Sequence, residues 1–77
     1  MKIVLSPHAL LRSKERQISE REIKDTIEHC EIRTPTTHRR RTRVMKKIDG
    51  RMITVIYEQR DGYWLVVTCA KTEKEGE

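Results

Sequence analysis

The chain has 77 residues, and its 17 Lys and Arg residues against 12 Asp and Glu residues give a net charge of +5. A chain of this length forms one small domain, which buries only about 60% of its unfolded surface. The aliphatic composition predicts a thin core without a deep small-molecule pocket. No apolar run approaches the roughly 18 residues that cross a membrane, and the run KIVL is too short for the apolar part of a secretory signal. We therefore expect a cytoplasmic protein.

The two cysteines, Cys30 and Cys69, stand alone and far apart in the sequence. Without a secretory signal, such cysteines are typical of a reduced cytosolic protein rather than of a disulfide framework. A structural zinc site needs about four closely spaced ligands. His29 beside Cys30 is the only His/Cys pair, and neighbouring residues on a helix point apart. We expect neither a metal nor a cofactor.

The chain begins with a predicted strand and a predicted helix. Residues 2–5 are mostly apolar and short enough for one strand. Ser6 followed by Pro7 is typical of a helix start, because Ser is a preferred N-cap and Pro fits the first helical position. We expect the first helix over residues 7–16, with a break at residues 17–18.

A second helix is predicted over residues 20–31. Ser19, with Glu22 three residues later, matches a capping box at its start. Apolar side chains then recur at helical spacing, at Ile23, Ile27 and Cys30. The polar, Pro-containing stretch over residues 34–37 predicts a linker after this helix.

Three strand candidates fill the rest of the chain, over residues 38–48, 51–58 and 63–70. Asp-Gly pairs at residues 49–50 and 61–62 separate them, and the first pair is a strong signal for a two-residue hairpin turn. The resulting order, β-α-α-β-β-β, predicts an α+β fold with two helices packed on one face of a small, mainly antiparallel sheet.

The domain organisation follows from the same pattern. Residues 1–70 are expected to form the single α+β domain. Residues 71–77, with the sequence KTEKEGE, contain no apolar anchor and predict a flexible C-terminal tail.

Alternation assigns the strand residues to two faces. We expect the helices to cover a face formed by Val44, Ile48, Ile53, Val55, Tyr57, Leu65, Val67 and Cys69. The opposite face then carries Arg41, Arg43, Met45, Lys47, Met52, Thr54, Ile56, Trp64 and Thr68. The reverse assignment, with Trp64 in the core, stays open because faces depend on strand register.

The positive charge is concentrated in one segment. Residues 33–51 hold eight basic residues and one acidic residue, a local net charge of +7, whereas the rest of the chain has a net charge of −2. A charge run usually forms a solvated surface, but like charges at this density favour a partner that neutralises them. RNA is the first candidate and an acidic protein the second. The predicted nucleic-acid-binding residues are Arg39, Arg40, Arg41, Arg43, Lys47 and Trp64.

The first predicted helix carries His8, Arg12 and Arg16 at spacings of four, which places them along one stripe. The positive end of the helix dipole disfavours imidazolium in the first turn, and a neutral imidazole is able to act as a general base. The free amide groups at a helix start also attract phosphate. This arrangement is compatible with RNA cleavage without a metal, whereas a surface or capping role is the ordinary alternative for a lone His.

The pattern His8-Ala9, Arg12, Arg16, Ile18-Ser19, followed by a basic hairpin and the last-strand residues 66–68, resembles a family of small uncharacterised bacterial and archaeal proteins. That family, a domain of unknown function, is grouped with the barnase–EndoU–colicin–RelE ribonuclease fold. The resemblance covers roughly residues 3–70. It implies metal-independent RNA cleavage and often the role of a toxin with an antitoxin partner. It carries the site over to His8, Arg12, Arg16 and Thr68.

Two functions are therefore expected. The first is a metal-independent endoribonuclease, the toxin of a toxin–antitoxin pair, whose partners are RNA and an acidic antitoxin protein. The alternative is a non-catalytic RNA-binding or protein-interaction module of the same fold. The half-apolar sheet face is equally compatible with a homodimer surface.

Overall fold

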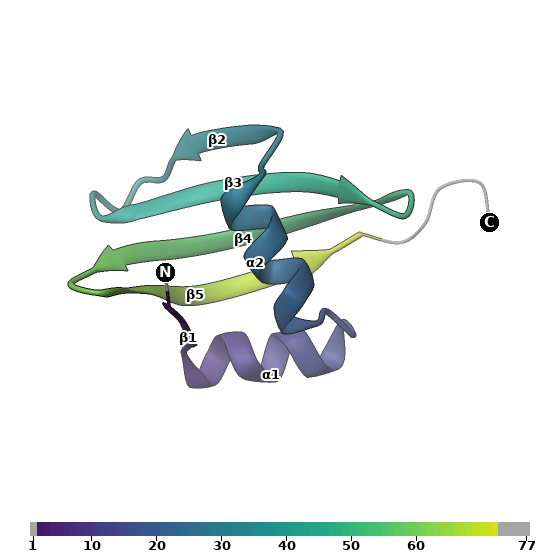
Figure 1. Ribbon diagram of the computed structural model, residues 1–77, viewed down its shortest axis with the longest axis horizontal. Coiled ribbons are helices and arrows are strands. Elements are labelled where there is room, and N and C mark those ends of the chain that lie inside the picture. Colours follow the sequence, from purple (N-terminus) through teal and green to yellow (C-terminus); the bar gives the residue numbers. More distant parts are fainter. Residues whose placement is uncertain (1, 73–77) are drawn as a thin grey trace.

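The protein folds into a five-stranded sheet with two helices (Figure 1). This computed structural model describes residues 2–72. The sheet has the strand order β1-β5-β4-β3-β2, in which β1 is parallel to β5 and the other neighbours are antiparallel. In chain order the elements are β1 (Lys2–Leu5), α1 (Pro7–Glu15), α2 (Glu20–Glu28), β2 (Ile32–Pro35), β3 (Arg41–Ile48), β4 (Arg51–Arg60) and β5 (Tyr63–Lys71).

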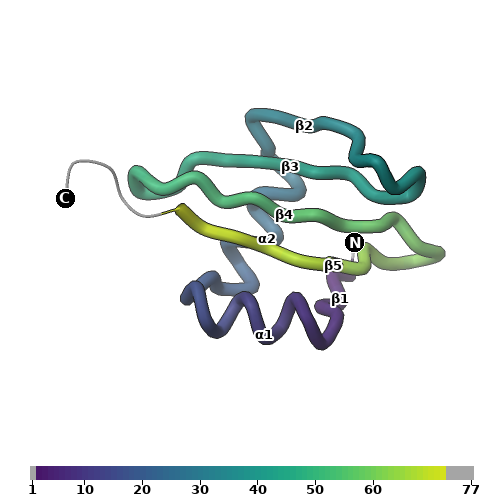
Figure 2. Tube along the Cα trace, turned by 180° about the vertical axis from the view of Figure 1, so that it is seen from behind, coloured from purple at the N-terminus to yellow at the C-terminus, as the bar shows by residue number. Residues whose placement is uncertain are grey.

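The two helices take different positions on the sheet. α2 crosses one face, where it contacts β3 and β4, whereas α1 lies along β5 beyond the end of the short strand β1 (Figure 1). Seen from behind, the strands lie in front of α2, and no helix of the described chain covers them on that side (Figure 2). The sheet therefore has one face buried under α2 and one face left uncovered.

Local sequence signals place the helix starts. The Ser6 side chain accepts a hydrogen bond from the Ala9 amide at 3.1 Å, as expected of an N-cap. Ser19 and Glu22 form the predicted capping box, in which the Glu22 carboxylate accepts from the Ser19 amide at 2.9 Å. Gln17 has a φ of 55° between the two helices, which ends α1 and redirects the chain.

The hairpin between β3 and β4 also follows the sequence prediction. Asp49 has a φ of 53° and Gly50 a φ of 77°. Positive φ at both central residues is the requirement of a type I′ turn, whose twist matches that of the flanking strands. This turn fixes the register of β3 against β4, with Val44 opposite Val55.

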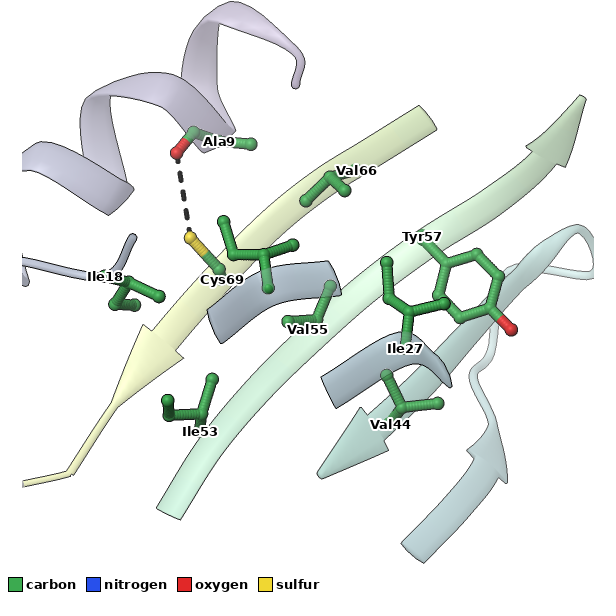
Figure 3. Packing of buried hydrophobic residues seen from close by; sticks show 10 residues of the cluster. Ala9, Ile18, Ile27, Val44, Ile53, Val55, Tyr57, Val66 and Cys69 are labelled. Atoms are coloured by element: carbon green, nitrogen blue, oxygen red, sulfur yellow. Dashed lines mark hydrogen bonds between the residues drawn. The ribbon is translucent and has the colours of Figure 1, made fainter. Parts of the chain in front are cut away.

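The core lies between α2 and the sheet (Figure 3). Ile23 and Ile27, one turn apart on α2, are almost completely buried. They pack in one cluster with the β-branched side chains Val44, Ile53, Val55 and Val66. Complete burial of each aliphatic side chain stabilises the fold by about 1.5–3 kcal/mol. At the β5 edge, the Cys69 thiol donates to the Ala9 carbonyl at 3.7 Å and joins α1 to the core.

The α+β fold class is confirmed, and so is the burial of Val44, Ile53, Val55, Tyr57 and Cys69. The predicted linker is wrong in part, because residues 32–35 form β2 at the edge of the sheet. Its pairing partners in β3 are seven or more residues away in the sequence, which local turn propensity does not reveal.

Several element ends also differ from the prediction. α2 ends at Glu28 rather than at residue 31, and β3 begins at Arg41 rather than at residue 38. β5 extends to Lys71, and the Thr72 amide donates to the Met52 carbonyl at 3.0 Å. The first two residues of the predicted tail are therefore held by the sheet, and residues 73–77 lie outside the described part.

A β-bulge in β5 overturns part of the face assignment. Ile56 pairs with Thr68 and Tyr57 pairs with Val66, so the alternation of β5 shifts by one residue at this point. Val66 is buried in place of the predicted Leu65 and Val67. Trp64 likewise lies on the α2 side, with its ring centroid 5.9 Å from that of Tyr57, so its predicted place on the open face is wrong.

Candidate nucleic-acid interface

The sheet face opposite α2 has no helix over it in the described part of the chain (Figure 2), and we call it the uncovered face. Its residues are identified by register, since cross-strand partners share a face. Arg43, Ile56 and Thr68 form one cross-strand row, between rows of buried residues. The face includes Arg41, Arg43, Met45, Lys47, Met52, Thr54, Ile56, Glu58, Leu65 and Thr68, together with their partners Ile32, Thr34 and Ala70. It therefore combines aliphatic side chains with cationic ones.

Strand alternation divides the basic segment between the two faces. On the α2 side, Arg33 donates to the Tyr57 hydroxyl at 3.1 Å, and Lys46 forms an ion pair with Asp25 at 2.8 Å. On the uncovered face, Arg43 donates to the Thr34 hydroxyl at 3.3 Å, and Lys47 is exposed. The uncovered face therefore carries two exposed cations, Arg43 and Lys47, that a large anionic partner is able to reach.

The turn before β3 adds further positive charge beside this face. Arg39 and Arg40 are exposed there, and the Arg40 amide donates to Nδ1 of His38 at 3.4 Å. Arg41 begins β3 directly opposite Glu58 of β4. The predicted RNA-binding residues other than Trp64 are thus gathered along β3 and the turn that leads into it.

A cluster of charged side chains surrounds Glu58 at this end of the uncovered face. Arg60 contacts the Glu58 carboxylate at 2.7 Å, Arg41 at 3.5 Å and His38 at 3.9 Å. The Glu58 side chain is only 6% exposed, whereas the side chains of Arg60, Arg41 and His38 are each more than a third exposed. A hydrogen bond from Arg60, supported by the charges of Arg60 and Arg41, lowers the pKa of Glu58 although burial opposes the shift.

Two of the predicted catalytic residues, His8 on α1 and Thr68 on β5, lie at the same position along the length of β5. The Ser6 hydroxyl donates to the Val67 carbonyl at 2.9 Å, and the Cys69 thiol reaches the Ala9 carbonyl. Thr68 therefore lies beside the first turn of α1, which carries the exposed His8. No direct contact joins the two side chains in the described hydrogen-bond network.

The helix geometry also directs Arg12 toward the uncovered face. Ala9 and Ser13 form the buried stripe of α1, and successive helical residues are about 100° apart. Leu10 and Arg12 consequently project on opposite sides of that stripe. Leu10 lines a pocket with Leu5 on the α2 side, so Arg12 projects on the other side. Arg12 thus joins His8 and Thr68 at one border of the uncovered face.

Arg16 is not part of this group. It is the exposed C-cap residue of α1, about 12 Å along the helix axis from His8 at 1.5 Å per residue. There it lines a polar pocket with Arg51 and Lys71. His8, Arg12 and Arg16 do follow one another along α1, as their spacing predicted. Arg16, however, faces a different part of the surface from His8 and Arg12.

Sequence reasoning did not single out the Glu58 cluster. None of His38, Glu58 and Arg60 belongs to a recognisable motif in the sequence. The residues meet because β3 and β4 pair in one register, which places Arg41 opposite Glu58. A Glu at an outward position of a strand rich in β-branched residues was the only signal available.

The fold and the site define a small α+β domain with a basic, partly aliphatic sheet face. Residues 5–70 match the family described as the domain of unknown function DUF4258. The chain belongs to this family, as the resemblance to an uncharacterised family predicted. No curated protein and no solved structure matches the chain. Neither helix of the described chain is long and apolar enough to cross a membrane.

The ion pairs of Glu58 predict an acid-sensitive contribution to stability. A carboxyl group whose pKa is lowered on folding stabilises the native state above its unfolded pKa, and this contribution is lost as the pH falls through the lower, folded value. The ordinary pKa here is 4.5. We expect the free energy of unfolding to decrease below about pH 4.5, and Glu58→Gln to weaken that decrease.

Urea unfolding at a series of pH values from neutral to acid measures this effect. Glu28→Gln, at an exposed position of α2, is the matched control. The pKa of Glu22 is also lowered, by its hydrogen bond from the Ser19 amide. Part of the decrease in the free energy of unfolding at acid pH should therefore remain in both variants. The same acid slope in wild type and Glu58→Gln would show that the Glu58 contacts do not persist in solution.

Proposed function

We propose that the chain is a metal-independent endoribonuclease that binds single-stranded RNA on its uncovered face. The observation that carries the proposal is the composition of that face, with Arg43 and Lys47 among the aliphatic residues Met45, Met52 and Ile56. Cationic side chains neutralise phosphates, and an apolar platform accepts unstacked bases of single-stranded RNA. A double helix would not present its bases to such a platform.

The border formed by His8, Arg12 and Thr68 supports cleavage in addition to binding. RNA cleavage requires a base that takes the proton of the 2′-hydroxyl and cations that stabilise the charge on the phosphorus centre. It also requires an acid that protonates the leaving 5′-oxygen. An exposed imidazole at a helix start, with a guanidinium one turn away, provides the first two of these functions.

The resemblance of the His8-Ala9, Arg12 pattern to the barnase–EndoU–colicin–RelE group supports the same activity. On this proposal, the protein acts as a toxin, and an acidic antitoxin protein neutralises it by covering the basic face. The aliphatic residues of that face favour one alternative, a non-catalytic module that binds RNA, a protein or a second copy of itself there.

Cleavage of single-stranded RNA by the purified protein in the presence of EDTA tests the proposed activity. If His8 is the general base, we expect His8→Ala to reduce the cleavage rate by about 10²–10⁴-fold. The melting temperature should stay nearly unchanged, because exposed side chains contribute within about 0.5 kcal/mol. His29→Ala, at the exposed end of α2, is the control. An inactive wild type on varied RNA substrates would leave the binding module as the function.

Binding is tested by the salt dependence of RNA affinity. Arg43→Ala with Lys47→Ala should weaken the binding of all sequences and reduce the slope of log K against log salt by about 0.7 for each lost phosphate contact. The control variant, Arg21→Ala with Lys24→Ala, removes the same charge from the exposed side of α2. Equal slopes in the two double variants would place the RNA elsewhere.

A further inference from the structure

The polar pocket at the end of α1 lies where segments that are distant in the sequence come together. The end of α1, the last residues of β5 and the start of β4 all lie on the same side of the molecule (Figure 1). The pocket has a volume of about 290 Å³, just below the range of roughly 300–1,000 Å³ that is usual for sites of whole small molecules. It therefore fits a small polar group. Its lining residues are Glu15, Arg16, Gln17, Arg51, Lys71 and Thr72.

Hydrogen bonds fix the part of the pocket that β5 forms. The Lys71 side chain is only 12% exposed, and its Nζ donates to the Gln17 carbonyl at 3.2 Å and lies 3.6 Å from the Glu22 carboxylate. An ammonium group has three hydrogens, so one is left for a ligand. The Thr72 hydroxyl accepts from the Met52 amide at 2.9 Å, which leaves its own hydrogen available as a donor. Lys71 and Thr72 are thus held in place before a ligand binds.

The other cations of the pocket have no counter-charge of their own. Neither Arg16, which is exposed, nor Arg51, which is half-buried, forms an ion pair with another residue of the described chain. The single carboxylate of the lining, Glu15, lies 4.0 Å from the Arg12 guanidinium. Two unpaired guanidinium groups therefore line one polar space. Their mutual repulsion would be relieved by an anion bound between them.

We infer that this pocket binds the terminal phosphate of an RNA strand. The inference rests on the proposed function and adds to it a preference for one end of the substrate. A terminal phosphate carries about −1.5 to −2 charges at neutral pH, which balances the two guanidinium groups of Arg16 and Arg51. Each phosphate group inside the strand carries a single negative charge. The oxygens of the terminal phosphate accept paired hydrogen bonds from guanidinium groups and single ones from Lys71 and Thr72.

The pocket adjoins the uncovered face. The Thr72 amide donates to the Met52 carbonyl at 3.0 Å, and Met52 lies on the uncovered face opposite Lys47. Arg16 is about 12 Å from His8 along the axis of α1. An RNA strand that passes over Met52 toward the His8 border is therefore able to place its end in the pocket and an internal phosphate beside His8.

Three uncleavable 2′-O-methyl oligoribonucleotides of one sequence test the inference, one with a 5′-phosphate, one with a 3′-phosphate and one with neither. We expect the terminal phosphate at one of the two ends to raise the affinity of the wild type by about ten- to a hundredfold, the range of one hydrogen-bonded contact with a charged group. That end gives the direction of the bound strand. Arg16→Gln with Arg51→Gln should abolish the gain and leave the affinity for the unphosphorylated strand nearly unchanged. Glu15→Gln should increase the gain.

Arg21→Gln with Lys24→Gln removes two charges from the exposed side of α2 and is the matched control, which should keep the gain. Arg16→Gln alone, at an exposed position, keeps the test decisive if the double variant fails to fold, and should reduce the gain. Equal affinity of the wild type for all three oligonucleotides, or an equal gain from a phosphate at either end, would overturn the pocket while leaving RNA binding intact. A gain that survives Arg16→Gln with Arg51→Gln would also overturn it. A wild type that binds none of the three would overturn both proposals.

Discussion

A five-stranded sheet has two faces, and only one of the two helices, α2, packs on a face. α2 buries Ile23 and Ile27 against β3 and β4, while α1 is used at the edge of β5. The fold therefore has a stable core on one side and an uncovered surface of strand side chains on the other. Every functional proposal follows from this constraint, because the uncovered face is where a partner has access to side chains that the sheet holds in place.

Register determines what that face presents. The type I′ turn at residues 49–50 sets β3 against β4, so that Arg41 meets Glu58 and Arg43 meets Ile56. The β-bulge in β5 then returns Cys69 to the core and places Thr68 on the uncovered face. The same alternation directs Arg33 and Lys46 to the α2 side, where their partners are within the protein. The positive charge that the sequence concentrates in residues 33–51 is thus divided between the two faces of the sheet.

The features that the sequence predicted are those decided locally. Helix caps at Ser6 and Ser19 and the Asp49-Gly50 turn depend on residues within three positions of one another. The features that it did not predict depend on pairing between distant segments. β2 exists because it pairs with β3, and Trp64 joins the core because a bulge shifts its strand. The Glu58 cluster needs both a register and a turn conformation, so no spacing in the sequence marks it.

The central claim is that RNA lies on the uncovered face. Nuclear magnetic resonance spectra of the protein, labelled on its Met and Ile methyl groups and backbone amides, test it directly during titration with an uncleavable 2′-O-methyl oligoribonucleotide. The account predicts that the methyl signals of Met45, Met52 and Ile56 shift, together with the amides of β3. Shifts confined to the amides of α2, or an absence of shifts at saturating oligonucleotide, would contradict it.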